Sequence, residues 1–427
     1  MHGMLVGAAG LIAGAIVAQA ACAAGPSYKL LYSFSCKKCV DGAAANGLVE
    51  DSHGNIFGTA PGGKFGAGQA FELIRAVNNQ YTYRDIYDFC HLKNYCLDGG
   101  YPGPLVLDSH GNLYGVAEVG GMGWGEAFEL MPAGNSWQLR RLYSFCSRPK
   151  CADGVFPVGP FTYAGAAAGQ PYDGKSPLYG MTFGDGSNYE ANAFELQPAG
   201  STWQEQVIQD FCNDGNCADY EVPGFVLVAD GSGDLYGTLQ TDSSGRDGSV
   251  FELSPNGDNW TYSTTYNFCS QPNCADGELP STTLALDSSG SLYGGTQLGG
   301  YACKNDGGCG VVYQLGAGSQ ESVLHTFCTT DCFDGYSPVG YVFLDAAGNV
   351  YGTALNGGNF TYNSEGGGTT FEIHDGQFLL LHQFCNQAHC ADGSKPTSLI
   401  RDPSGKLFGV AGAGGAHNQG AIFEIDF

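Results

Sequence analysis

A four-part pattern of apolar and polar positions recurs along the chain at intervals of fifty-odd residues. In the copy that runs from residue 102 to 145, alternating apolar residues predict four short strands separated by turn residues. A tight hairpin is predicted between the first two strands, because Asp opens the turn and Gly precedes the next strand. The strands are expected at 105–108, 113–117, 127–130 and 137–145, with the hairpin turn at 108–112.

The second strand carries the most regular signature, an aliphatic residue followed by Tyr or Phe and then Gly. It occurs seven times, at 56–58, 113–115, 178–180, 235–237, 292–294, 350–352 and 407–409. A period of this length, built from short strands, predicts an all-β fold: a seven-bladed β-propeller of four-stranded antiparallel blades. The chain ends after a third strand and carries an unpaired strand-like segment at 28–34, which we expect to complete the last blade and close the ring.

Strand order assigns the loops to faces. Loops that join a fourth strand to the next first strand, and a second strand to its third strand, should emerge on one face. The predicted first-to-second hairpins should lie on the opposite face. Ligands are expected near the axis on the loop-rich face, since binding residues concentrate on loops that a rigid scaffold positions.

Cysteines mark one of these loops in every repeat, where two closely spaced cysteines follow a Phe and the second begins Cys-x-Asp. Nearly complete pairing indicates disulfides and an oxidising compartment. Zinc is the alternative, but four ligands would have to converge on one point, and the blades hold the pairs apart. The predicted disulfides are Cys36/Cys39, Cys90/Cys96, Cys146/Cys151, Cys212/Cys217, Cys269/Cys274, Cys328/Cys332, Cys385/Cys390 and an eighth local pair, Cys303/Cys309.

The N-terminal residues predict export. An apolar run from Leu5 to Ala18 is followed by small residues, which is typical of a signal peptide cleaved after Ala20 or after Ala23 or Ala24. We therefore expect a signal peptide over 1–24, one propeller domain over 28–427, and a secreted or periplasmic protein. Anchoring as a lipoprotein through Cys22 is the alternative.

The repeated Gly-Asn-Leu-Tyr-Gly, Gly-Gly and Phe-Glu-Leu segments resemble the Gloeo/Verruco (GloVer) tandem-repeat family of exported bacterial proteins. The resemblance covers nearly all of the chain after the signal segment. It implies an exported β-repeat protein and carries over no catalytic residue. The paired cysteines are an addition to the basic repeat.

A formal net charge of −25 argues against nucleic acid as a partner, because phosphates require a basic surface. No membrane span, cofactor or metal is predicted, and we expect a monomer. The string Gly169 to Ser176 matches a phosphate-binding loop, but a strand rather than a helix follows it, so we interpret the match as chance. The Asp of each Cys-x-Asp is interpreted as a structural turn residue.

Function in a repeat protein should appear where one copy departs from the rule. Aromatic rings beside carboxylates and amides suit sugar recognition, since rings stack on apolar faces and polar groups bind hydroxyls. We therefore predict a binding module for a glycan or a cell-surface ligand; the alternative is a carbohydrate-active hydrolase or lyase at the channel mouth, and no catalytic motif is present. The candidate ligand-binding residues are Trp124, Glu126, Tyr189, Glu190, Arg246, Lys304, Asp306, Tyr362, Glu365 and His417.

Overall fold

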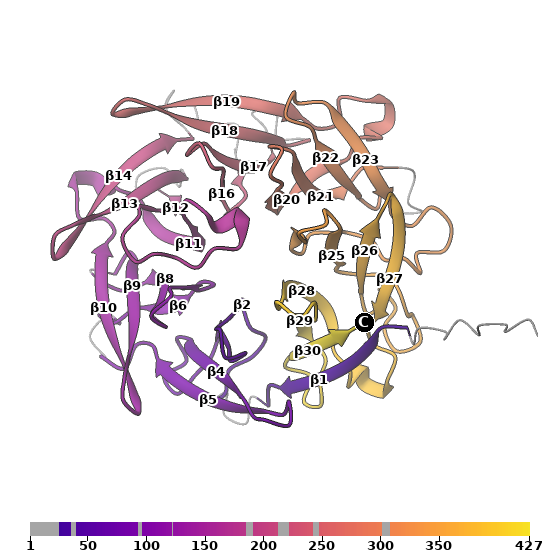
Figure 1. The fold of residues 1–427 in the computed structure, drawn as a ribbon, viewed down its shortest axis with the longest axis horizontal. Helices are drawn as coiled ribbons and strands as arrows, with labels where there is room; N and C mark the ends of the chain where they lie inside the picture. The colour runs from indigo at the N-terminus through magenta and orange to yellow at the C-terminus, as the bar shows by residue number, and fades with distance from the viewer. Residues whose placement is uncertain are drawn as a thin grey trace, which may run out of the picture.

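The computed structural model describes residues 25–35, 40–92, 96–121, 123–184, 191–211, 222–241, 247–300 and 308–427. Within them the chain forms seven antiparallel sheets arranged as a ring around a central axis (Figure 1). This confirms the predicted seven-bladed propeller. No helix of the described part is long and apolar enough to cross a membrane.

The first four blades follow the chain from its N-terminal half. In blades 2 and 4 the innermost strand is split in two. The strands are β2 (Gly47–Glu50), β3 (Ile56–Ala60), β4 (Gln69–Arg75) and β5 (Tyr81–Asp88); β6 (Gly100–Pro102), β7 (Val106–Leu107), β8 (Leu113–Val119), β9 (Glu126–Ala133) and β10 (Ser136–Ser144); β11 (Val155–Thr162), β12 (Leu178–Gly184), β13 (Asn192–Ala199) and β14 (Thr202–Asp210); and β15 (Val222–Pro223), β16 (Val228–Ala229), β17 (Leu235–Thr241), β18 (Ser249–Asn256) and β19 (Asn259–Asn267).

Blades 5 to 7 complete the ring, and four short 3-10 helices lie in the connections. The strands are β20 (Glu278–Leu286), β21 (Leu292–Leu298), β22 (Val311–Leu315) and β23 (Glu321–Thr326); β24 (Val342–Leu344), β25 (Val350–Ala354), β26 (Thr369–His374) and β27 (Gln377–Gln383); and β28 (Ser394–Arg401), β29 (Leu407–Ala413), β30 (Ala421–Asp426) and β1 (Ser27–Ser33). The helices are η1 (Pro149–Cys151), η2 (Ala166–Ala168), η3 (Pro272–Cys274) and η4 (Ala388–Cys390).

The first strand of the chain closes the ring, as predicted. β1 pairs antiparallel with β30, with Ser27 opposite Asp426 and Ser33 opposite Ala421, so the last blade has the sheet order β1-β30-β29-β28. Figure 1 shows the indigo strand β1 beside the yellow strand β30. The edge of β30 is thereby paired rather than exposed, which removes a template for aggregation.

The core lies between neighbouring blades. The aromatic residue of each third-strand signature, Phe in six blades and Tyr313 in blade 5, is fully buried. It packs against a Phe that follows the fourth strand of the preceding blade. For example, Phe145 meets Phe194 of the next blade edge to face, with ring centroids 4.9 Å apart. Such aromatic pairs favour edge-to-face geometry and bury large apolar areas, so they hold adjacent blades together.

Candidate functional site

The cysteine loops and the Gly-Gly loops lie together on one face, which we call the cysteine face. The amide of Gly300 donates to the carbonyl of Cys274 at 2.8 Å, and Gly358 donates in the same way to Cys332. Disulfides join Cys90 to Cys96, Cys146 to Cys151, Cys269 to Cys274, Cys328 to Cys332 and Cys385 to Cys390. Cys309 is also disulfide-bonded. Its predicted partner Cys303, with Cys36, Cys39, Cys212 and Cys217, lies outside the described residues.

The Asp of Cys-x-Asp organises the cysteine loop. Asp276 is fully buried, and its Oδ2 accepts hydrogen bonds from the amide of Ser270 at 2.9 Å and from the hydroxyl of Tyr266 at 2.8 Å. Asp153 has the same partners in its own loop, Ser147 and Tyr143. Both carboxylates accept hydrogen bonds from their own loop and are therefore not free to bind a ligand. This agrees with the structural interpretation of the Cys-x-Asp motif in these loops.

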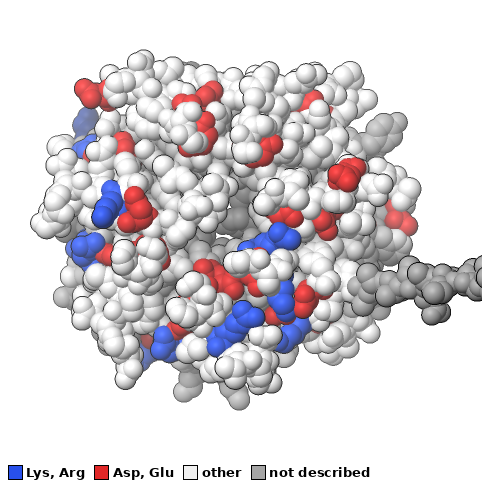
Figure 2. All heavy atoms as spheres, viewed as in Figure 1, with Lys and Arg blue, Asp and Glu red and all other residues white. Residues whose placement is uncertain are grey.

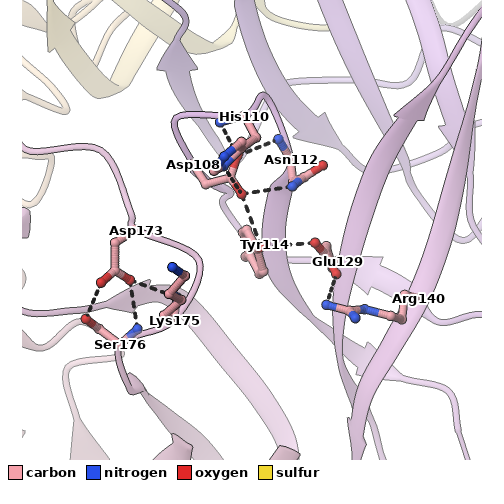
Figure 3. Close-up of polar contacts among 9 residues, drawn as sticks. All are labelled: Asp108, His110, Asn112, Tyr114, Glu129, Arg140, Asp173, Lys175 and Ser176. Atoms are coloured by element: carbon pink, nitrogen blue, oxygen red, sulfur yellow. Dashed lines mark hydrogen bonds and ion pairs between the residues drawn. The ribbon is translucent and has the colours of Figure 1, made fainter. Parts of the chain in front are cut away.

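The hairpins between first and second strands lie on the opposite face, where a second repeated network holds them (Figure 3). Asp108 accepts from the amides of His110 and Asn112, each at 2.8 Å, and from the hydroxyl of Tyr114 at 3.2 Å. Tyr114 also donates to Glu129, which forms an ion pair with Arg140. An equivalent Asp–Tyr–Glu network occurs at Asp345, Tyr351 and Glu372 of blade 6, so it is architectural.

The phosphate-loop match belongs to an inserted hairpin on this opposite face. Asp173 accepts from the amides of Lys175 and Ser176 at 2.8 and 2.7 Å (Figure 3), and β12 begins two residues later. The amides that would face a phosphate are thus turned toward a carboxylate, and no helix follows. The chance interpretation of this motif is consistent with that geometry.

On the cysteine face, a ring of five residues surrounds the mouth of the axial channel, and we call them the rim residues. Each precedes a proline at the start of an innermost strand and has a positive φ between 53° and 55°. Each amide donates to a loop carbonyl of the preceding blade at 2.6 to 3.0 Å. The rim residues are Tyr101, Phe156, Leu279, Ser337 and Lys395.

The conformation of the rim residues is imposed by contact between blades. A residue before proline normally favours extended backbone, so a left-handed conformation there costs free energy that other contacts must offset. At the junction of blades 2 and 3, Pro157 packs on Gly125, where an added Cβ would lie 2.2 Å from the proline Cδ. Close packing and the amide hydrogen bond together fix the backbone. The side chain of the rim residue takes no part in these contacts, and its type differs from blade to blade.

Exposed aromatic side chains concentrate on the cysteine face. The described residues contain eight exposed Phe, Tyr and Trp side chains, and the loop positions place seven of them on this face. Trp124 is 41% exposed and lies 5.6 Å from the rim residue Phe156, ring centroid to ring centroid. The seven are Phe65, Tyr101, Trp124, Phe183, Phe333, Phe360 and Tyr362; the eighth, Phe427, follows β30 at the opposite face.

A cavity of about 260 Å³ opens on the cysteine face where blades 1, 2 and 3 meet. Its wall is largely apolar, and its polar side chains are Asn46, Tyr101 and Glu118. The Asn46 amide nitrogen already donates to the carbonyl of Pro102 at 2.7 Å. Its lining is completed by Pro61, Pro102, Gly103, Pro157, Val158 and Gly159.

A second cavity, of about 190 Å³, lies deeper among the innermost strands of five blades. Its lining includes Leu48, Leu105, Tyr341, Leu399 and Ile400, and it contains no ionisable acid or His. The part of the channel wall that these residues form is therefore largely apolar.

The predicted ligand-binding residues fall into three groups. Trp124, Tyr362 and His417 are exposed on the cysteine face, and Glu365 is exposed there in an ion pair with Lys395 at 3.2 Å. Glu126 is fully buried instead. The remaining candidates, Tyr189, Glu190, Arg246, Lys304 and Asp306, lie outside the described residues.

Glu126 begins β9 and points into the blade, where its Oε2 lies 2.5 Å from Nε of Arg141. Burial raises the pKa of this carboxyl to about 7, and the Arg141 guanidinium opposes that rise. Among the described residues no second carboxylate stands across a cleft from it, and Glu365 lies in blade 6 on the far side of the mouth. The two described acids therefore do not form the facing pair that a glycoside hydrolase needs.

Sequence reasoning missed Tyr101 and Glu118, the two residues that give the cavity its chemistry. Tyr101 is 51% exposed, and Glu118 is exposed near the end of β8 without a hydrogen bond or ion pair to the described residues. The signal for Tyr101 was available: it occupies the position before Pro at which the five rim residues all differ.

The face drawn in Figure 2 carries acidic and basic side chains scattered around a central hollow, with broad uncharged areas between them. Basic side chains gather over the blades that contain β1, β2 and β28. No continuous basic surface of the kind that binds nucleic acid is present on this face.

Comparisons with known proteins agree with the fold. Residues 222–427 match the family model of the Gloeobacter/Verrucomicrobia repeat. The match confirms the resemblance to that repeat family over this part of the chain. No curated protein matches the chain.

Many solved structures share the architecture at low sequence identity. A polysaccharide lyase aligns with a TM-score of 0.52 and 10% identity, over 90% of this chain and 89% of its own. An α-L-arabinofuranosidase from Fusarium graminearum aligns with a TM-score of 0.44 and 11% identity, over 90% and 92% of the two chains. At these identities the likeness shows the propeller fold alone.

Proposed function

We propose that the protein is an exported, non-catalytic binding module that recognises a glycan chain on the cysteine face. The single observation that carries the proposal is the concentration of exposed aromatic side chains on that face, beside the cavity at the channel mouth. Aromatic rings offer flat apolar surfaces for the faces of sugar rings, and the disulfides stiffen the loops that present them. Export is supported by the disulfides, since they persist in oxidising compartments.

The distribution of the rings over successive blades suits a linear polymer rather than a compact ligand. Phe65, Tyr101, Trp124 and Phe183 lie on successive blades 1, 2 and 3 around the mouth, so they form an arc that we call the aromatic arc. Rings on successive blades can each contact a different sugar unit. An enzyme is the weaker alternative, because the two described candidate acids, Glu126 and Glu365, are each in an ion pair and lie in different blades.

The experiment is binding of the full chain to a panel of immobilised polysaccharides and oligosaccharides, followed by titration calorimetry. Trp124→Ala should weaken binding by roughly 5- to 30-fold, the equivalent of about 1–2 kcal/mol for loss of a ring at a binding centre. Phe427→Ala removes an exposed ring on the opposite face and should leave the affinity unchanged. Equal losses in the two variants, or no binding anywhere on the panel, would refute the proposal.

A further inference from the structure

The cavity at the junction of blades 1, 2 and 3 has the composition of a site for one sugar ring of a particular charge. Its volume of about 260 Å³ lies below the roughly 300–1,000 Å³ of pockets that enclose drug-sized ligands, so it suits a single ring. Three prolines and Val158 form an apolar wall, and Tyr101 contributes an exposed ring. One face of a pyranose can pack on these groups while its polar substituents point to the mouth.

Glu118 determines which ring is accepted. Among the described residues that line the cavity, Glu118 is the only carboxylic acid, and none is Lys, Arg or His. Glu118 makes no hydrogen bond or ion pair with the described residues, so its carboxylate is available. Lys64, a basic residue of the adjoining loop, lies over the ring of Phe65, with Nζ 5.4 Å from the ring centroid.

The charge of the whole molecule reinforces this local charge. The formal net charge is −25, which attracts cationic polymers and repels anionic ones before contact. A carboxylate without a counterion at the mouth of an apolar cavity is complementary to an ammonium group. It also disfavours a uronic acid, since two carboxylates would face each other without a cation between them.

From this complementarity we infer that the cavity is a subsite for a protonated amino-sugar ring, with the ammonium group held by Glu118 and the ring packed on Tyr101 and the prolines. The inference rests on the proposed glycan-binding function and assigns it a substrate class: a polysaccharide that contains glucosamine-type units. The contact is a charge-assisted hydrogen bond, which is stronger than a neutral one.

The test compares four oligosaccharides of equal length by titration calorimetry with the full chain, at a pH where free amines are protonated. They are a glucosamine oligomer, its N-acetylated form, a glucose oligomer and a glucuronate oligomer. We expect the glucosamine oligomer to bind most tightly and the glucuronate oligomer most weakly. Its affinity should also fall with added salt, because the ammonium–carboxylate contact is screened.

Two variants with matched chemistry separate the outcomes. Glu118→Gln should weaken the glucosamine oligomer by about tenfold and leave the glucose oligomer unchanged. Asp258→Asn removes an exposed carboxylate from the β18–β19 hairpin on the opposite face and should change neither. Binding that depends on Trp124 but not on Glu118, or that is equal for the glucosamine and glucose oligomers, would overturn this inference and leave the proposed function standing. If no oligomer or polysaccharide bound, both this inference and the proposed function would be refuted.

Discussion

At the scale of single residues, the repeated positions of this chain serve architecture and the variable positions face solvent at the mouth. Asp276 illustrates the first kind, since it is buried and ties together the amides and hydroxyls of its loop. Tyr101 illustrates the second, because the same backbone position holds Leu in blade 5 and Lys in blade 7. The side chains to which we assign the proposed binding are thus ones that the fold does not need.

The repeated carboxylate can be tested directly. Asp276→Ala should lower the free energy of unfolding by about 1–2 kcal/mol, because it removes the buried carboxylate that accepts from the Ser270 and Gln271 amides. Urea denaturation measures the loss. Asp258→Ala, in an exposed hairpin tip, is the control and should have little effect. Equal midpoints for the two variants would contradict a structural role for the motif.

Individual site residues were only partly predictable. Trp124 and Tyr362 were expected on the loop-rich face and are exposed there. Glu126 was expected to be available to a ligand, yet it shares its side of β9 with Phe128 and Leu130, which are buried. Alternation along a strand places residues two apart on one side, so this burial was readable from the sequence once β9 was known to begin at Glu126.

At the scale of elements, the sequence predicted strand order and hairpin turns because they follow from local patterns. It predicted the closing strand because the count of repeated strands leaves the last blade without its fourth strand. The cavity could not be predicted from such local patterns. It depends on a left-handed residue before proline, a conformation that the local sequence disfavours and that only the neighbouring blade enforces. Contacts between blades therefore had to be seen in three dimensions.

The pairing of β1 with β30 is the element-scale contact on which the ring depends. A disulfide across Ser27 and Asp426, which are register partners, should slow unfolding and raise the free energy of unfolding by about 2–4 kcal/mol, because it blocks separation of the two strands. Unfolding rates in denaturant measure the effect. The matched control is the double variant Ser27→Ala/Asp426→Ala, which loses the same Asp426–Lys406 ion pair without the cross-link. Equal unfolding rates would show that the ring opens elsewhere.

At the scale of the whole molecule, the excess of acidic residues and the burial of some of them together determine how stability depends on pH. The chain carries 42 acidic against 17 basic residues, and some of these acids are buried in the blades. Glu126 and Glu205 are fully buried side chains paired with the half-exposed guanidinium groups of Arg141 and Arg148. Burial raises the pKa of both carboxyls to about 7, and the arginines only partly offset the rise.

These raised pKa values predict a stability that falls as pH rises. In the unfolded chain both carboxyls release their protons near pH 4.5, whereas in the folded protein they hold them up to about pH 7. Stability from this source is therefore complete below pH 4.5, declines between pH 4.5 and 7, and is lost above pH 7. The decline should amount to about 1–3 kcal/mol per group.

Urea midpoints measured from pH 4.5 to 8 check this sign. The double variant Glu126→Gln/Glu205→Gln should show a flatter profile, because glutamine mimics the protonated carboxyl at every pH, whereas Glu365→Gln should keep the wild-type profile since Glu365 is exposed. A wild-type stability that instead rises through this window would mean that the ion pairs with Arg141 and Arg148 outweigh burial. Both buried carboxyls would then be ionised in the folded protein and would join strands and loops through ion pairs, rather than being neutral inside the blades.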